Sequence, residues 1–186
     1  MKTMNVTWDG QAWPDCQQYE PDDEPGILDG FFYWKAAVLL ADKTTSMKPG
    51  LPETFSKPFA CLVSGLLYNP GRGPNAFRLR SDGATVEAAV DIKATVGTSA
   101  NATFSRFLRF DEVYWLNMTD HVNLRFSIIR FTKAEIGAVL RRPKAEPDRG
   151  FVGPWRLSQD LGRSPFLSGR IGFVREKMAT PALIAV

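Results

Sequence analysis

Two charged residues, Asp91 and Lys93, stand two positions apart in a segment rich in Val, Ile and Thr. Such a segment is typical of a β-strand, and residues two apart on a strand project from the same face. A carboxylate can bind a divalent cation, and a neighbouring ammonium can orient a water molecule or stabilise developing negative charge. The triplet Asp91-Ile92-Lys93 is therefore suited to metal-assisted chemistry on an anionic group.

A predicted β-hairpin would bring Asn75 beside this triplet. Residues Phe77–Arg80 alternate between apolar and basic, as a half-buried strand does. Asp82-Gly83 is a strong hairpin-turn signal, and Ala84–Thr95 contains neither Gly nor Pro and is predicted to be the returning strand. A turn centred on Asp82-Gly83 makes residue 75 face residue 90, next to Asp91.

Asp82 is the competing acid of this hairpin. Nine extended residues at roughly 3.3 Å each place it about 30 Å from Asp91 along the strand. The two carboxylates therefore cannot share a metal, and we interpret Asp82 as a turn residue. Asn75 offers a carbonyl oxygen but no negative charge, so we expect it to hold Mg²⁺ more weakly than an aspartate would.

Three segments together resemble the core of type II restriction endonucleases of the PD-(D/E)XK superfamily. They are GPNAF at residues 73–77, VDIKAT at residues 90–95 and RFDEVYWLNM at residues 109–118. In that family a Pro-Asp pair precedes a hairpin, an Asp/Glu-x-Lys triplet, a helix and another core strand. The resemblance covers roughly residues 51–131.

The resemblance implies an α/β fold with a mixed central β-sheet flanked by helices, and Mg²⁺ as the cofactor. Asp91 would be a metal ligand and Lys93 the catalytic lysine. Asn75 occupies the place of the family's first Asp and would be the second metal-site residue. Glu53, on the predicted helix before the hairpin, would be an additional acid of the site; the alternative is a first-turn Glu that favours the helix dipole. The implied partner is double-stranded DNA, bound by a homodimer with one active site per strand.

Basic and polar residues around the hairpin are candidates for DNA contacts, because Arg binds guanine and phosphate with two parallel hydrogen bonds. The alternative is an ordinary solvated surface. The candidates on either side of the proposed site are Arg72, Arg78, Ser99, Asn101, Thr103, Ser105, Arg106 and Arg109.

Composition and length favour one folded domain. The 186 residues are 44% hydrophobic and 12% aromatic, and the net charge of +3 means that a nucleic-acid site must come from local clusters of Arg and Lys. We find no signal peptide and no apolar run of about 18 residues, and so expect a cytoplasmic protein with no membrane contact. A single histidine, His121, and two isolated cysteines give little basis for histidine or thiol chemistry. We expect Cys61 to be a core residue and His121 to lie in a surface loop.

The predicted elements divide the single domain, residues 1–186, into a core and two flanking regions. Residues 1–26 are expected to form an irregular arm, and residues 143–186 a Pro-, Gly- and Arg-rich C-terminal region with a strand near 170–174. Between them we predict helices at 27–43, from 52 or 57 to 66, and at 133–141 capped by Thr132; strands at 76–80, 84–95, 112–118 and 123–131; and a polar loop or short helix at 98–109.

Two functional classes follow. The first is a magnesium-dependent, site-specific DNA endonuclease whose activity is attenuated by Asn75. The second is a module of the same fold that binds DNA without cutting it. A structural or interaction protein with a chance Asp-x-Lys triplet is a third alternative.

Overall fold

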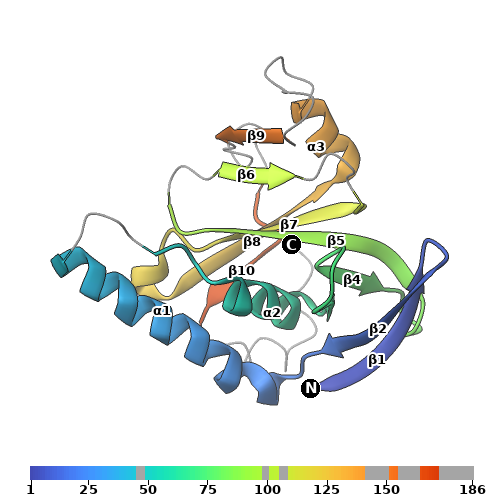
Figure 1. Cartoon of the computed structure of the whole chain (residues 1–186), viewed down its shortest axis with the longest axis horizontal. Helices are drawn as coiled ribbons and strands as arrows, with labels where there is room; N and C mark the ends of the chain where they lie inside the picture. The colour runs from blue at the N-terminus through green and yellow to red at the C-terminus, as the bar shows by residue number, and fades with distance from the viewer. Residues whose placement is uncertain (45–48, 98–100, 105–108, 141–150, 155–163, 172–186) are drawn as a thin grey trace.

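The computed structural model describes residues 1–44, 49–97, 101–104, 109–140, 151–154 and 164–171, and these form an α/β structure (Figure 1). Eight strands form one mixed sheet in the order β1-β2-β3-β4-β5-β7-β8-β10, and β6 pairs with β9 in a separate two-stranded sheet. Neighbours in the large sheet are antiparallel except β5 and β7, which are parallel. The strands are β1 (Lys2–Trp8), β2 (Gln11–Gln18), β3 (Leu67–Tyr68), β4 (Ala76–Leu79), β5 (Val86–Thr95), β6 (Asn101–Phe104), β7 (Glu112–Asn117), β8 (Arg125–Thr132), β9 (Phe151–Pro154) and β10 (Leu167–Arg170).

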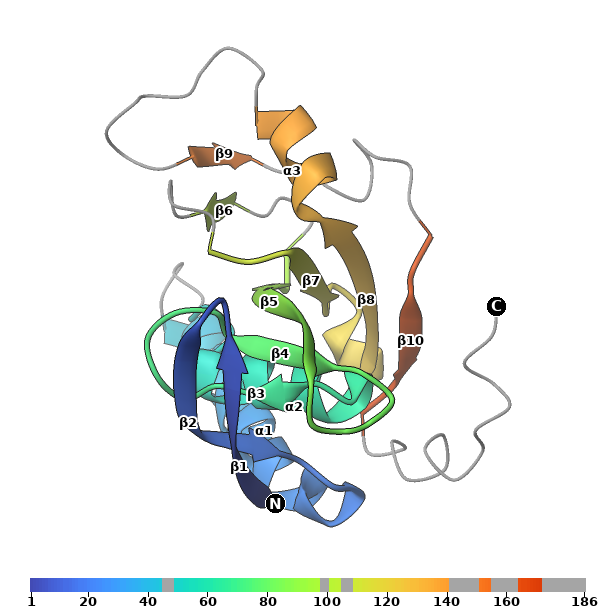
Figure 2. The same cartoon turned by 90° about the vertical axis from the view of Figure 1, so that its right-hand side faces the viewer.

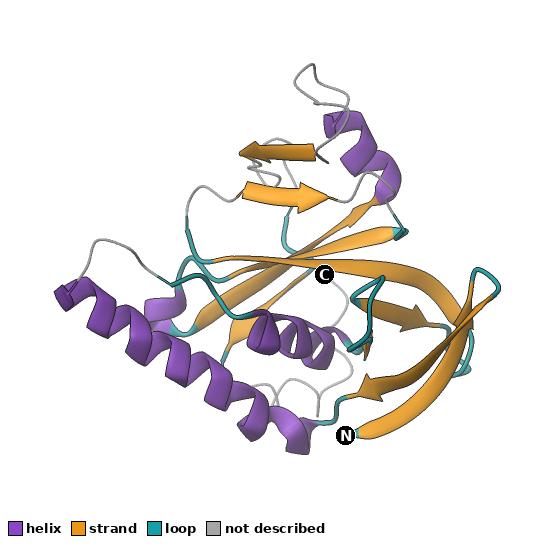
Figure 3. Cartoon of the chain, viewed as in Figure 1, coloured by secondary structure: helices purple, strands orange, loops and turns teal. Residues whose placement is uncertain are grey.

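Two helices, α1 (Glu24–Thr44) and α2 (Glu53–Ser64), cover one face of the large sheet, and the β6–β9 pair lies beyond its other face (Figure 3). The third helix, α3 (Lys133–Leu140), continues directly from β8, and two short 3-10 helices are η1 (Pro21–Asp23) and η2 (His121–Asn123). The main core lies between α1, α2 and the sheet, where Phe31, Phe55 and Phe59 pack against Ile92 and Leu116. This core fixes α2 in front of the carboxyl-terminal half of β5.

The expectation of an irregular arm over residues 1–26 is wrong. These residues form the β1–β2 hairpin, which curls away from the rest of the sheet (Figure 2), followed by η1 and the first residues of α1. Asp9 and Gly10 turn the hairpin with φ values of 51° and 70°, the left-handed geometry that an Asp-Gly hairpin turn requires. Pro14 is tolerated because it lies where the register shifts between β1 and β2, outside the regular ladder.

The hairpin of β4 and β5 exists, but its register differs by one residue from the prediction. Ala76 faces Val90, Phe77 faces Ala89 and the ladder shifts between Arg78 and Leu79. The connection is longer than a two-residue turn, because β5 begins at residue 86 and not at residue 84. Asp82 shapes this connection by accepting hydrogen bonds of 2.9 Å from the backbone N–H groups of residues 84 and 85. These bonds and one from the Thr85 hydroxyl lower the pKa of Asp82 to about 2, which confirms its role as a turn residue.

The helix before the hairpin begins at Glu53, and Pro58 lies inside it. The proline does not shift the start to residue 57, because the buried side chains of Phe55, Phe59 and Leu62 hold the helix against the core. Gly65, in the left-handed conformation with φ 66°, ends the helix.

Several other expectations can be compared with the structure. The strands at 112–118 and 123–131 are confirmed as β7 and β8, and the helices at 27–43 and 133–141 as α1 and α3, with ends that differ by one to three residues. The Thr132 hydroxyl caps α3 by accepting a hydrogen bond from the Glu135 N–H. Within 98–109, residues 101–104 form a strand and not a loop or helix, because they pair with β9. A strand was expected near 170–174, but β10 spans Leu167–Arg170 and shares only Arg170 with that range; residue 171 is in a turn, and residues 172–174 lie outside the described ranges.

Cys61 is buried in the core as expected, whereas His121 is part of η2 and contacts the Trp34 ring at a centroid distance of 5.2 Å. None of the helices in the described ranges has both the length and the apolar character needed to cross a membrane.

Candidate functional site

The candidate site lies at an open edge of β5. On one side β5 pairs with β7 up to Thr95. On the other side it pairs with β4 only as far as Val90, which faces Ala76, the first residue of β4. No described strand pairs with residues 91–95 on that second side. A pocket of about 310 Å³ opens here, between the edge of β5 and the first turn of α2. The residues that line the pocket are Leu51, Glu53, Ser56, Lys57, Asn75, Asp91, Ile92, Lys93, Ala94 and Trp115.

Asn75, the residue directly before β4, binds the backbone of β5 where the β4–β5 pairing stops. Its backbone N–H donates to the Val90 carbonyl over 3.0 Å, and its side-chain Oδ1 accepts a hydrogen bond of 2.8 Å from the Ile92 N–H. The second bond satisfies a backbone donor that a longer β4 would otherwise have met. Residue 75 is thus held at the Asp91-Ile92 peptide, as the hairpin argument predicts. The remaining terminal atom of the amide is a nitrogen, which donates hydrogen bonds and cannot bind a cation.

A short loop, residues 69–74, leads the chain into Asn75. The buried Asn69 side chain donates a hydrogen bond of 2.8 Å to the Pro74 carbonyl, and the Asn69 N–H donates to the Asn75 carbonyl over 2.9 Å. Gly73 has a φ of +122° and lies directly against the Trp13 ring. The loop therefore places residue 75 through backbone contacts that depend on a glycine at position 73.

We expect Gly73→Ala to destabilise the protein by about 3 kcal/mol, because the new Cβ adds both backbone strain and a clash. That Cβ would lie 2.5 Å from Cη2 of Trp13, which packs against Phe77 and cannot move freely. Gly83→Ala is the matched control, since Gly83 also has a positive φ, +67°, but has nothing within 4 Å of the new Cβ. Urea unfolding followed by tryptophan fluorescence measures both. Equal losses in the two variants would contradict the close packing at Gly73.

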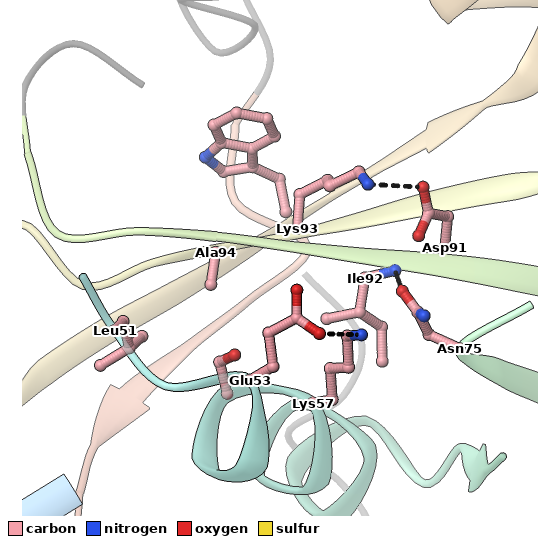
Figure 4. A pocket seen from close by; sticks show the side chains of 10 residues that line it. Leu51, Glu53, Lys57, Asn75, Asp91, Ile92, Lys93 and Ala94 are labelled. Carbon is pink, nitrogen blue, oxygen red and sulfur yellow. Dashed lines mark hydrogen bonds and ion pairs between the residues drawn. The ribbon is translucent and has the colours of Figure 1, made fainter. Parts of the chain in front are cut away.

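Asp91 and Lys93 project from one side of β5, and Ile92 and Ala94 from the side that faces α2 (Figure 4). The Lys93 Nζ lies 3.0 Å from Oδ2 of Asp91, and the two side chains are only 26% and 16% exposed. Burial raises the pKa of Asp91 above its ordinary value, although the Lys93 ammonium and the Ile92 N–H favour the charged form. A buried carboxylate beside an ammonium at an open pocket is typical of functional sites, although structural ion pairs share this property.

Glu53 and Lys57 bring a second ion pair into the pocket from the first turns of α2 (Figure 4). They are one helical turn apart, with Lys57 Nζ 2.5 Å from Glu53 Oε2. This contact holds the pKa of Glu53 below its ordinary value, with a smaller contribution from Lys93. The sequence predicts Glu53 at the site, whereas a lysine at the position of Lys57 is ordinarily solvated; in the structure its side chain is only 20% exposed and lines the pocket. The signal in the sequence that could have placed Lys57 at the site is its i, i+4 spacing from Glu53, which favours an ion pair on one face of the helix.

The oxygen donors of the pocket suit a hard divalent cation. Mg²⁺ binds oxygen ligands, keeps several of its waters and needs only one or two carboxylates when a phosphate supplies a further oxygen. Asp91 and Glu53 provide the two carboxylates, and Asn75 Oδ1 retains a second lone pair. Within the described ranges no three His, Cys, Asp or Glu side chains converge as a metal site. The donor types are those that Mg²⁺ prefers, with less negative charge than three acids would supply, and Mg²⁺ binding stays a prediction.

The predicted DNA-contact residues fall into three groups. Arg72 and Arg109 are exposed, and Arg72 stands in the loop that leads to Asn75. Arg78 pairs with the carboxylates of Glu112 and Glu87, so its guanidinium has protein partners in this structure. Asn101 and Thr103 lie on β6, and Ser99, Ser105 and Arg106 lie outside the described residues. Contact with DNA stays a prediction for all of them.

Glu112, at the start of β7, binds two arginines from other strands of the large sheet, Arg78 on β4 and Arg130 on β8. Its buried carboxylate accepts hydrogen bonds from both Arg78 and Arg130, with the shortest at 2.5 Å from Arg130 Nη2. Burial alone would raise the pKa of Glu112, but the two guanidinium groups lower it below the ordinary value of 4.5. The charged form is therefore the one that stabilises the fold. That stabilisation is complete above pH 4.5 and is lost as the pH falls through the lowered pKa.

We expect Glu112→Gln to lower the free energy of unfolding by about 2 kcal/mol at pH 7, because two partly buried guanidinium groups lose their shared carboxylate. The loss should shrink as the pH falls below 4.5 and disappear below the lowered pKa of Glu112, where the parent carboxylate is itself protonated. Glu87→Gln removes the more exposed partner of Arg78 and should cost less than about 1 kcal/mol. Urea unfolding between pH 3.5 and 7, at roughly half-unit steps, measures both. A pH-independent difference for Glu112→Gln would contradict this role.

No family model, no curated protein and no solved structure matches this chain.

Proposed function

We propose that this chain is a magnesium-dependent, site-specific double-stranded DNA endonuclease with a restriction-endonuclease-like fold, and that Asn75 attenuates its activity. The convergence of Asn75, Asp91, Lys93 and Glu53 in one pocket carries the proposal. These residues come from the loop before β4, from β5 and from α2, and the sequence pattern together with the resemblance had selected them. The mixed sheet with α2 in front of β5 supports the resemblance on which the proposal rests, whereas the described part of the segment between β5 and β7 is the strand β6 and not the helix of the family pattern.

The pocket's chemistry fits hydrolysis of a phosphodiester. Bound Mg²⁺ would supply charge stabilisation at the phosphate and a water of lowered pKa. Asp91 and Glu53 would hold the ion, with Asn75 as a weak neutral ligand. Lys93, beside Asp91, would orient the attacking water or stabilise negative charge on the phosphate oxygens. Lys57 would neutralise part of the charge on the incoming DNA strand.

A second candidate is a module of the same fold that binds DNA without cutting it. The amide of Asn75 favours this candidate, because its oxygen is already hydrogen-bonded to the Ile92 N–H and its other terminal atom is a nitrogen. The pocket then offers two carboxylates, each of which is paired with a lysine. Both candidate proteins bind DNA, and only the first cleaves it.

The test is a digest of long, unmethylated DNA of diverse sequence with the parent chain and with Asp91→Ala, in Mg²⁺, in Ca²⁺ and in EDTA. The endonuclease proposal predicts discrete double-stranded fragments that need Mg²⁺ and Asp91. Sequence-selective binding in Ca²⁺ without fragments would select the second candidate. A chain that neither cuts nor binds DNA under any of these conditions would refute both.

A further inference from the structure

Helix α1 has an apolar outer face in addition to the face that it buries. On the buried side the apolar residues recur every three or four positions, at Ile27, Phe31, Trp34 and Val38. On the opposite side Phe32, Tyr33 and Leu39 are 50%, 77% and 58% exposed. A helix that is apolar on both sides is typical of one that is buried on both sides. The position of α1 at the periphery of the molecule leaves this outer side towards solvent (Figure 1).

The outer face of α1 comprises Phe32, Tyr33, Ala36, Leu39 and Leu40, which is 62% exposed. At 3.6 residues per turn, all five lie within about 60° of the direction of Ala36. The face has two large residues at each end and a small residue in the middle. Its pattern of side-chain size is therefore the same in both directions along the helix.

We infer that a second copy of this chain covers the outer face of α1, with the two α1 helices packed antiparallel about a two-fold axis at Ala36. Such an axis sets Phe32 of one copy against Leu40 of the other, and Tyr33 against Leu39. Ala36 meets its own counterpart, and its small side chain permits an interaxial distance near the lower end of the usual 8–10 Å. A two-fold interface needs a self-complementary patch, and this face provides one.

The exposed area is sufficient for a specific interface. Burying the exposed parts of the two aromatic and two leucine side chains removes on the order of 500 Å² per copy. Two copies together would bury roughly 1,000 Å² from these residues alone, which is the lower bound for a stable protein–protein contact. With 21 residues, α1 is about 31 Å long, so flanking residues add to this area.

The charges around the helix argue against a lipid surface as the occupant. Asp22 and Asp23 precede α1 and Asp29 lies in its second turn, whereas the Glu24 side chain is buried. Anionic lipids would repel this end of the helix, whereas interfacial helices carry Lys and Arg on their polar side. The inference does not rest on the proposed nuclease function, because the outer face of α1 is distinct from the residues that line the pocket.

The first experiment measures the mass of the full chain in solution by light scattering after size exclusion, over a range of concentrations. We expect twice the 20.7 kDa of one chain. Ala36→Glu places two carboxylates at the two-fold axis and should weaken association at least 30-fold or so. Ala12→Glu is the matched control: it makes the same change at an exposed position of β2, in the hairpin at the other end of the molecule. It should leave the dimer intact.

The second experiment fixes the orientation of the two helices. Both native cysteines are buried, so Ala36→Cys adds one accessible thiol to each copy. Oxidation should link the two copies through residue 36, because an axis there brings the Cα atoms within the 4.4–6.8 Å that a disulfide spans. Asp29→Cys should not form a link, since the two positions would lie about 21 Å apart along the antiparallel helices.

A monomeric parent chain, or an Ala36→Glu variant that remains dimeric, would overturn the inference. Equal linking at residues 29 and 36 would overturn the antiparallel arrangement. DNA cleavage plays no part in either readout, so a chain that fails to cut DNA leaves this inference intact.

Discussion

Replacing Asn75 with aspartate should raise Mg²⁺-dependent DNA cleavage by three or more powers of ten. The Asn75 oxygen accepts a hydrogen bond from the Ile92 N–H at 2.8 Å, and an aspartate oxygen can accept the same bond. The second oxygen would then replace the amide nitrogen and add a negative charge to the metal site. A gain of about 4 kcal/mol in stabilisation of the metal-bound transition state corresponds to a thousandfold faster reaction.

The measurement is a single-turnover digest of both forms across a Mg²⁺ titration, paired with DNA binding in EDTA and in Ca²⁺. DNA binding depends mainly on phosphate and base contacts, so we expect it to change far less than cleavage. In EDTA we expect slightly weaker binding by Asn75→Asp, because the new charge faces the phosphate. Asn5→Asp is the control: Asn5 Oδ1 also accepts a backbone hydrogen bond, 3.1 Å from the Asp15 N–H, which an aspartate can keep, and Asn5 lies on β1 and does not line the pocket. If Asn75→Asp cuts no faster at saturating Mg²⁺, residue 75 is not at the metal site.

The arrangement of the hairpin could be predicted from the sequence because its signals are local. The Asp-Gly turn, the alternating residues of β4 and the long Val-rich β5 all lie within about twenty positions of one another. The one-residue error in register arose at the irregularity between Arg78 and Leu79: Leu79 faces Val86 as predicted, but Arg78 faces Ala88. That error affects which residue faces Asp91, but it does not separate Asn75 from the site.

The β1–β2 hairpin was not predicted, although the sequence contains a local signal for it. Asp9-Gly10 carries the same turn signal as Asp82-Gly83, and Val6, Trp13 and Cys16 are the buried residues on either side of it. The prediction of an irregular arm over residues 1–26 did not use this signal, and β2 also contains Pro14, which is unusual within a strand. In the structure the register shift between β1 and β2 accommodates the proline, and such a shift cannot be read from composition.

The place of Lys57 could not be predicted because it depends on tertiary packing. A lysine in the second turn of a helix is normally solvated, since burial of an ammonium is unfavourable. Here the buried aromatic residues Phe55 and Phe59 fix the rotation of α2 and turn Lys57 towards β5. The Glu53 carboxylate neutralises the charge of the Lys57 ammonium. The pair therefore enters the pocket as a consequence of core packing on the other side of the same helix.

Lys93→Ala should slow cleavage by about 10²–10³-fold while leaving DNA affinity nearly unchanged. The Lys93 ammonium lies 3.0 Å from Asp91 at the mouth of the pocket, where it can reach a water or phosphate oxygen beside the metal position. A group that acts mainly on charge developing in the transition state affects turnover more than ground-state binding. Loss of one such donor typically costs about 10²–10³-fold in rate. The most active form of the chain, expected to be Asn75→Asp, is the background in which this loss can be measured.

Lys57→Ala, in the same background, is the matched comparison for Lys93. Both lysines line the pocket, and each pairs with one carboxylate. Lys57 stands on α2 with the more exposed Glu53, so we expect it to contribute general attraction to DNA and to reduce cleavage by about tenfold or less. Single-turnover rates at saturating enzyme, together with affinities in Ca²⁺, separate the two roles. A Lys93→Ala variant that cuts as fast as its parent would exclude a catalytic role for Lys93. A larger loss of cleavage rate in Lys57→Ala than in Lys93→Ala would assign the catalytic role to Lys57.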